Sequence, residues 1–279
     1  MNQWVFTQRE TPAALLAVAG GEPMHQLVQG DVAFICGRWP LDPAQRTLVF
    51  IHGAGESSVL WPAQVEGLSA HANTIALDLP GHGRSGGSAR DRVSDYAAAV
   101  DDFIRAVGAP RPVPCGLSMG GAITQQLLID NGDRFPAGII VSSGARLRVL
   151  PSLFERIRTD FAGYVDLIDR LGFSAQTPPG LKAPFLEDSL RAHPEVAAGD
   201  FAACDRFDVM AQLDRIRVPV LVISAEDDQL TPPKYADFLE AHIPGAVRAH
   251  IRAAGHFVPI EKPAAVNAAI LRFMETNPL

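Results

Sequence analysis

The amino-acid sequence predicts an α/β protein with a doubly wound, mostly parallel sheet and an inserted helical cap. Short apolar runs rich in β-branched residues alternate with longer runs of helical period. The short runs are almost continuously apolar, as the strands of a sheet covered on both faces must be. One segment, from about residue 146 to 213, breaks the alternation, because helical periods dominate it and no strand is evident.

Length, composition and charge limit the possible domain organisation and the possible binding partners of the chain. With 279 residues, of which 47% are hydrophobic and 20% charged, the chain is typical of a soluble globular protein. We expect a core built from residues 1–145 and 214–279, with residues 146–213 inserted as the cap. The net charge of −7 offers no basic surface, so we expect neither nucleic acid nor a membrane as a partner.

The cysteines and the amino-terminal segment bear on location. Cys36, Cys115 and Cys204 lie far apart, with no Cys-x-x-Cys or Cys/His spacing. They predict neither a disulfide framework nor a metal site, and they fit the reducing cytoplasm. Residues 12–21 are faintly like the apolar core of a signal peptide, but the run is short and charged residues precede it. We expect an amino-terminal helix or arm there.

The strands and helices follow from hydrophobic period. Strands are expected at 31–37, 46–53, 111–117, 138–144, 218–225 and 247–255, and at the start of 72–85, which runs on into a Gly/Pro turn. Helices are expected at 93–108, with Ser94 as the N-cap, directly after Ser118, and at 263–275. In the cap, apolar residues recur at helical steps until "TPPG" at 177–180 interrupts them.

The stretch "GLSMG", residues 116–120, surrounds one serine with glycines between an apolar strand and a helix. It matches G-x-S-x-G, in which a sharp strand-to-helix turn pushes the serine hydroxyl clear of the sheet edge. The glycines let neighbouring backbone approach without a Cβ clash, and the helix start directs N–H groups at the same place. A chance match in an ordinary connection is the alternative, and the surrounding strand and helix argue against it.

Five motifs occur in order along the chain. They are "HGAG" (52–55), "DLPGHGRS" (78–85), "GLSMGGA" (116–122), "SAEDDQLTPP" (224–233) and "AAGHF" (253–257). With these motifs the sequence resembles the α/β-hydrolase family over nearly its whole length. The resemblance implies a nucleophile, an acid and a histidine in that chain order, and no cofactor or metal. Ser118 is the implied nucleophile.

The histidine and the acid come from the last two motifs. His242 sits in a helical run and His250 in an alternating strand, whereas His256 lies in a glycine-containing loop beyond the last strand, so His256 is the expected base. Glu226, Asp227 and Asp228 all qualify as the acid by position. The family pattern favours Asp228, with Asp227 as the second choice and Glu226 as the third, although Ala225 stands where glycine is usual.

The resemblance also implies an oxyanion hole. Its donors would be the backbone N–H groups of Ala54, in the loop after the 46–53 strand, and Met119, directly after the nucleophile. His52 and His82 are expected to be structural residues that support their loops.

The nucleophile narrows the reaction. Relatives that open epoxides or displace halide carry aspartate at this position, so Ser118 predicts acyl transfer to water through an acyl-enzyme. We expect a carboxylesterase-like enzyme acting on a small-molecule ester, with lactonase, thioesterase, C–C bond hydrolase and a non-catalytic ligand-binding protein as alternatives. Apolar cap residues are the expected substrate contacts, although the same side chains could simply pack the cap: Leu153, Phe154, Ile157 and Phe161.

Overall fold

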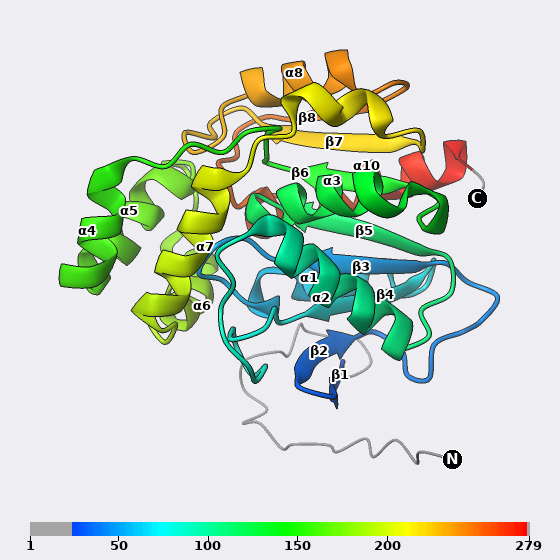
Figure 1. Cartoon of the computed structure of the whole chain (residues 1–279), viewed down its shortest axis with the longest axis horizontal. Coiled ribbons are helices and arrows are strands. Elements are labelled where there is room, and N and C mark those ends of the chain that lie inside the picture. The colour runs from blue at the N-terminus through cyan, green and yellow to red at the C-terminus, as the bar shows by residue number, and fades with distance from the viewer. Residues whose placement is uncertain (1–23, 278–279) are drawn as a thin grey trace.

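The computed structural model describes residues 24–277, which contain an eight-stranded sheet (Figure 1). The strands are β1 (His25–Gln29), β2 (Val32–Cys36), β3 (Thr47–Ile51), β4 (Asn73–Leu77), β5 (Pro112–Leu117), β6 (Gly138–Val141), β7 (Val220–Ala225) and β8 (Val247–Ile251). Their spatial order is β1-β2-β4-β3-β5-β6-β7-β8. Strands β3 to β8 run parallel, and β2 pairs antiparallel with β1 and β4. The predicted sheet class is confirmed.

Strand β1 is the one strand of the described chain that the sequence prediction lacks. It forms a hairpin with β2 through Gly30, whose φ of +60° suits glycine. Because β1 lies at the edge of the sheet and is only partly buried, it carries polar residues instead of an apolar run. The seven predicted strands are all present, and β6 and β8 end earlier than expected because their last residues turn into loops.

Side chains on the two faces of the sheet enter two separate apolar cores. In β3, Val49 and Ile51 belong to one core, whereas Leu48 and Phe50 belong to the other. The helices of the first core are α2 (Val93–Ala106), α3 (Met119–Asn131) and α8 (Lys234–His242). Those of the second are α1 (Pro62–Leu68), α9 (Val258–Glu261) and α10 (Pro263–Thr276). Both faces are therefore covered, which explains the apolar strands.

Four α-helices and the short 3-10 helix η3 (Met210–Arg215) separate β6 from β7. The α-helices are α4 (Pro151–Thr159), α5 (Phe161–Gly172), α6 (Pro179–Ser189) and α7 (Pro194–Arg206). Figure 1 shows them together at one end of the sheet. Four of their side chains form a small core of their own: Ile157, Tyr164, Val165 and Ala197. The interruption expected at "TPPG" covers the last two residues before α6 and the first two residues of that helix. The limits of 146–213 for a separate cap unit remain a prediction.

Two details of the sequence prediction have different outcomes. Helix α2 begins after Arg92, and Ser94, the expected N-cap, lies within the first turn, where its hydroxyl contacts the Asp95 carboxyl. The expected amino-terminal helix or arm at 12–21 lies outside the described residues. Within residues 24–277, none of the helices has the length and apolar character needed to cross a bilayer.

Candidate active site

Ser118 stands at the turn between β5 and α3. Its φ of +55° and ψ of −114° place it in a backbone conformation that non-glycine residues rarely adopt. Two hydrogen bonds hold the turn: Ser118 N–H donates to the Val141 carbonyl at 3.0 Å, and the Ser143 hydroxyl donates to the Ser118 carbonyl at 2.7 Å. The strained backbone is thus fixed by neighbouring strand β6, and the side chain remains half-exposed.

The glycines around Ser118 are required by close packing. A Cβ on Gly116 would lie 1.9 Å from the Gly120 carbonyl oxygen, and a Cβ on Gly120 would lie 2.2 Å from the Ile51 carbonyl oxygen. Gly121 packs against Ser143, whose Cβ would lie 2.5 Å from an added methyl group. Side chains at these positions would push β5, α3 and β3 apart, so the glycines allow the sharp turn.

His256 and Asp228 meet at the carboxyl ends of β8 and β7. The Asp228 carboxylate lies 2.9 and 3.1 Å from His256 Nδ1 through its two oxygens. Thr231 supports the pair, because its hydroxyl donates to Asp228 Oδ2 at 2.8 Å and lies 3.2 Å from His256 Nδ1. With Nδ1–H directed at the carboxylate, the neutral imidazole keeps a free lone pair on Nε2.

The two other candidate acids lie elsewhere. Asp227 accepts a hydrogen bond from the Ser174 hydroxyl at 2.6 Å, and Glu226 accepts one from Ala253 N–H at 3.0 Å. His250, in β8, lies beside the hydroxyl of Ser224 in β7, and His242 is exposed on α8. Asp228 and His256 are therefore the acid and the histidine that the fold brings together.

Electrostatics within the pair favour a proton on the histidine. Burial opposes charge on His256, but the carboxylates of Asp228, Glu56 and Glu261 together raise the pKa of His256 above its ordinary value, with Asp228 contributing most. Burial likewise disfavours the Asp228 carboxylate, yet His256 and the Thr231 hydrogen bonds lower the pKa of Asp228. An imidazolium formed at His256 would thus be stabilised where it forms.

The expected oxyanion donors flank Ser118. Met119 is the first residue of α3, where backbone N–H groups have no acceptor within the helix. Ala54 lies in the loop after β3 and lines the same cavity as Ser118, and its N–H donates to no acceptor in the described part of the chain. Both N–H groups are available to a ligand oxygen, as the oxyanion role requires.

The histidines expected to be structural are embedded in the loops. His52 Nε2 accepts from Leu79 N–H at 3.0 Å, and burial lowers the pKa of His52 to about 3, so the ring is neutral. His82 Nε2 lies 2.7 Å from the Asp200 carboxylate of α7. Burial disfavours the charged ring, but Asp200 raises the pKa of His82 overall. Neither ring is among the side chains that line the cavity around Ser118.

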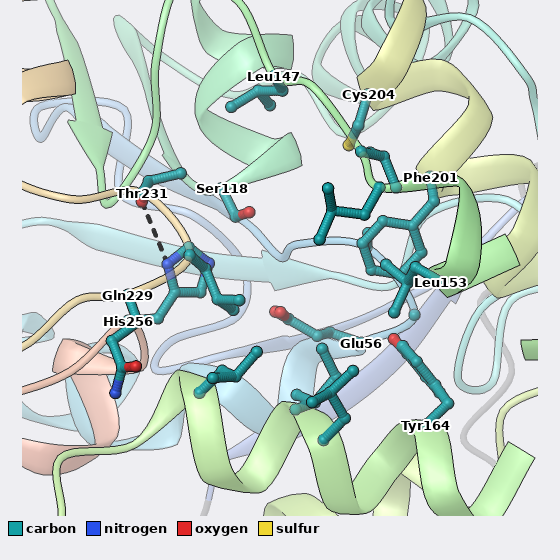
Figure 2. A pocket seen from close by; sticks show the side chains of 18 of the residues that line it. Glu56, Ser118, Leu147, Leu153, Tyr164, Phe201, Cys204, Gln229, Thr231 and His256 are labelled. Atoms are coloured by element: carbon teal, nitrogen blue, oxygen red, sulfur yellow. Dashed lines mark hydrogen bonds between the residues drawn. The ribbon is translucent and has the colours of Figure 1, made fainter. Parts of the chain in front are cut away.

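A cavity of about 470 Å³ opens in front of Ser118 and His256. Figure 2 shows both side chains pointing into it. Of the four expected substrate contacts, only Leu153 lines the cavity. The others were wrongly assigned: Ile157 is fully buried in the small core of α4, α5 and α7, Phe161 packs against that core, and Phe154 does not reach the cavity. The apolar wall comes instead from other residues: Leu147, Val165, Ile168, Phe185 and Phe201.

Two acidic residues at the site were missed from the sequence. Glu56, directly after "HGAG", lines the cavity and is 8% exposed. Asp200, in α7, is fully buried and accepts hydrogen bonds from Gly55 N–H at 2.8 Å and the Tyr96 hydroxyl at 2.5 Å. The only available signal for Glu56 was its place beside the oxyanion loop, and Asp200 lay in a helix with several other acids.

The chain is similar to known esterases and to a lactonase. The pimeloyl-[acyl-carrier protein] methyl ester esterase of Nitrosomonas europaea is 27% identical over 215 residues, which cover 71% of this chain and 84% of that protein. The 3-oxoadipate enol-lactonase 2 of Acinetobacter baylyi is 27% identical over 244 residues, 82% of this chain and 88% of that protein. The solved structure of a thermophilic esterase is 32% identical, covers 88% of this chain and 93% of that one, and superposes with a TM-score of 0.76.

A family profile described as the alpha/beta hydrolase fold matches residues 46–263. The matched region runs from β3 to the start of α10 and includes the turn at Ser118 and the loops of Asp228 and His256. The match therefore spans most of the chain and every part of the candidate site, and the chain belongs to the alpha/beta hydrolase fold family.

Proposed function

We propose that this chain is a carboxylic ester hydrolase that works through an acyl-enzyme on Ser118. The single observation that carries the proposal is the hydrogen-bonded Asp228–His256 pair beside a serine held at φ +55° in the same cavity. A serine hydroxyl needs a neighbouring base to become a nucleophile, and His256 Nε2 is that base. The esterase and lactonase names of the relatives support the reaction class.

The reaction proceeds in two halves. In the first, Ser118 Oγ bonds to the ester carbonyl carbon while His256 Nε2 takes the hydroxyl proton, and the N–H groups of Ala54 and Met119 hold the resulting oxyanion. Collapse breaks the bond to the alcohol, which leaves with the proton from His256. In the second half, His256 takes a proton from water, hydroxide attacks the acyl carbon, and Ser118 Oγ departs with that proton. Asp228 orients the imidazole and stabilises its charge throughout.

The substrate is proposed as a small ester with an apolar acyl or alcohol part. The apolar residues of the cavity wall and the volume of about 470 Å³ suit such a molecule. A lactone is a cyclic ester cleaved by the same steps, and the lactonase relative makes it the second candidate.

Hydrolysis of p-nitrophenyl acetate and butyrate by the wild type and by Ser118→Ala tests the proposal. We expect Ser118→Ala to lower kcat by about a million-fold, as loss of a nucleophilic serine does in another serine hydrolase. Ser94→Ala, an exposed serine on α2, is the matched control and should keep full activity. A fluorophosphonate should label Ser118 stoichiometrically, as peptide mass spectrometry would show. Equal rates for the wild type and Ser118→Ala would contradict the proposal and favour a ligand-binding protein.

A further inference from the structure

Glu56 is a buried carboxyl group that the proposed reaction does not use. It follows the oxyanion loop and is 8% exposed, and its Oε2 accepts a hydrogen bond from Gly53 N–H at 2.8 Å. That is the one hydrogen bond its carboxyl accepts within residues 24–277. A carboxylate offers about four acceptor positions. Most of the acceptor capacity of Glu56 is therefore left for a ligand.

The carboxyl lies in the space that the substrate must occupy. Glu56 lines the cavity that contains Ser118 and His256, and Figure 2 shows it between the imidazole on one side and Tyr164 on the other. Ser118 and His256 meet the ester group, so a substituent close to the scissile carbonyl would meet Glu56. The position is suited to sensing the chemical character of the substrate.

The two histidines near Glu56 are each paired with another carboxylate, His256 with Asp228 and His82 with Asp200. Facing Glu56 are His256 from the loop after β8, Tyr164 of α5, Asp200 of α7 and His82 from the loop after β4. Burial raises the pKa of Glu56 to about 7, against the Gly53 hydrogen bond and His256, which lower it. Near neutral pH the carboxyl is thus divided between its two forms, and a cation beside it would hold it ionised.

The arginines of the cavity do not offset this charge. Arg148, Arg156 and Arg170 line the cavity from the cap, but all three are exposed to solvent. Arg148 contacts the carbonyl and carboxylate of Asp205. Exposed charges are screened by water, whereas a charge beside a buried carboxyl interacts through a medium of lower dielectric constant. Glu56 therefore has a larger effect than these arginines on which charged substituents bind next to the ester group.

We propose that Glu56 is a specificity-determining residue that binds a cationic group of the substrate, so that the enzyme prefers amine-bearing esters over neutral esters of the same shape. This inference rests on the proposed function, because it names the substrate class of the same site. It makes no new demand on Ser118, His256 or Asp228. It concerns only the relative rates of differently charged esters.

Two pairs of cationic and neutral esters place the charge on either side of the scissile bond, and an anionic ester is added to the first pair. On the acyl side, ethyl 3-aminopropanoate is compared with ethyl butanoate and with the anionic monoethyl succinate. On the alcohol side, butyrylcholine is compared with its neutral isostere, 3,3-dimethylbutyl butanoate. We expect kcat/KM for the cationic member of at least one pair to exceed that of its neutral partner by at least about tenfold, the discrimination that a single charge-assisted contact supplies.

Glu56→Gln is the diagnostic variant. Its amide oxygen can still accept from Gly53 N–H, so the oxyanion loop keeps its support while the charge is removed. We expect it to lose the cationic preference, measured at one pH as the ratio of kcat/KM for the cationic and the neutral ester, because that ratio cancels any change in the basal rate. Glu187→Gln, an exposed residue of α6 outside the cavity, makes the same change of net charge and should keep the preference.

Several outcomes would overturn the inference while leaving the proposed function intact. These are equal rates within both ester pairs, faster hydrolysis of the anionic ester, and a cationic preference that survives in Glu56→Gln. If Glu56→Gln does not fold, the wild-type rate ratio of the butyrylcholine pair between pH 8 and 5.5 decides. The ratio cancels the shared titration of His256, so it must fall as Glu56 gains a proton, and a constant ratio would contradict the inference.

A failure of the proposed function would be seen separately, as no hydrolysis of any ester. The inference would then be tested by calorimetric binding of choline against 3,3-dimethylbutanol. Choline must bind at least about tenfold more tightly to the wild type and lose that advantage in Glu56→Gln. Equal affinities would overturn it.

Discussion

The Asp200 carboxylate accepts a hydrogen bond from the backbone N–H of Gly55 at 2.8 Å, which ties helix α7 directly to the loop that carries the expected oxyanion donor. The same carboxylate lies 2.7 Å from His82 and binds the Tyr96 hydroxyl. All of these groups are buried, so each would lose a buried acceptor if Asp200 were removed. One side chain therefore fixes a helix, a loop and a histidine relative to Ser118.

Replacement of Asp200 by alanine should destabilise the protein strongly. It would leave the His82 ring, the Tyr96 hydroxyl and Gly55 N–H without their buried acceptor, at a cost of about 3–5 kcal/mol in the free energy of unfolding. Urea denaturation measures this loss. Asp214→Ala, at an exposed aspartate before β7, should change the stability by less than about 0.5 kcal/mol. Similar free energies of unfolding for the two variants would show that the hydrogen bonds of Asp200 do not stabilise the protein.

Asparagine substitutions should distinguish Asp228 from its neighbour. Asp228→Asn removes the carboxylate that directs Nδ1–H of His256, so we expect kcat to fall by about ten-thousand-fold, as it does for a triad aspartate in another serine hydrolase. Asp227→Asn changes only a contact with the Ser174 hydroxyl and should keep kcat within a few-fold. The two kcat values for p-nitrophenyl butyrate measure the difference. A larger loss in Asp227→Asn would refute the assignment.

Activity should decline on the acid side at a higher pH than an ordinary histidine would give. Only neutral His256 can accept the proton of Ser118, and its pKa lies above the usual 6.5, so kcat/KM falls as the pH drops through that raised value. The negative charge of Glu56 contributes to the raised pKa of His256. In Glu56→Gln the acid limb should therefore move to lower pH. Complete pH–rate profiles of both proteins test the sign, and a shift to higher pH would contradict it.

Two glycine-to-alanine variants should behave in opposite ways. Gly120→Ala would bring a Cβ to 2.2 Å from the Ile51 carbonyl oxygen, so we expect a loss of several kcal/mol or failure to fold. Gly132→Ala has open space around it and a helical φ of −50°, so it should be neutral or stabilising by up to about 1 kcal/mol. Thermal unfolding compares the variants. An unchanged Tm in Gly120→Ala would show that the close approach of α3 to β3 is not needed.

The fold class and the family were predictable because they depend on patterns that many residues share. Every apolar strand of the parallel part follows from covering the sheet on both faces, and the glycines beside Ser118 record a turn that leaves no room for side chains. The edge strand β1 escaped prediction, since its half-exposed position requires no apolar run. The residues expected to lie near Ser118 were identified from the order of the motifs along the chain, which can be read from the sequence without a structure.

The cavity wall was harder to predict because helical period alone does not say which neighbour a face meets. Leu153 and Ile157 are one turn apart in α4, yet the first lines the cavity and the second packs against α5 and α7. Glu56 was overlooked for a related reason. A single acid in a loop is usually solvated, and only its burial beside His256 distinguishes it.

The segment that carries helices α4 to α7 is hydrogen-bonded to the rest of the chain at two margins. Asp200 binds one margin to the Gly55 loop, and at the other Ser174 N–H donates to buried Glu261 at 2.9 Å while its hydroxyl holds Asp227. Moving this segment away as one piece would leave several of these polar groups without a hydrogen-bond partner, at a free-energy cost of about 1–3 kcal/mol for each. A rigid-body movement of α4 to α7 would therefore have to break hydrogen bonds at both margins.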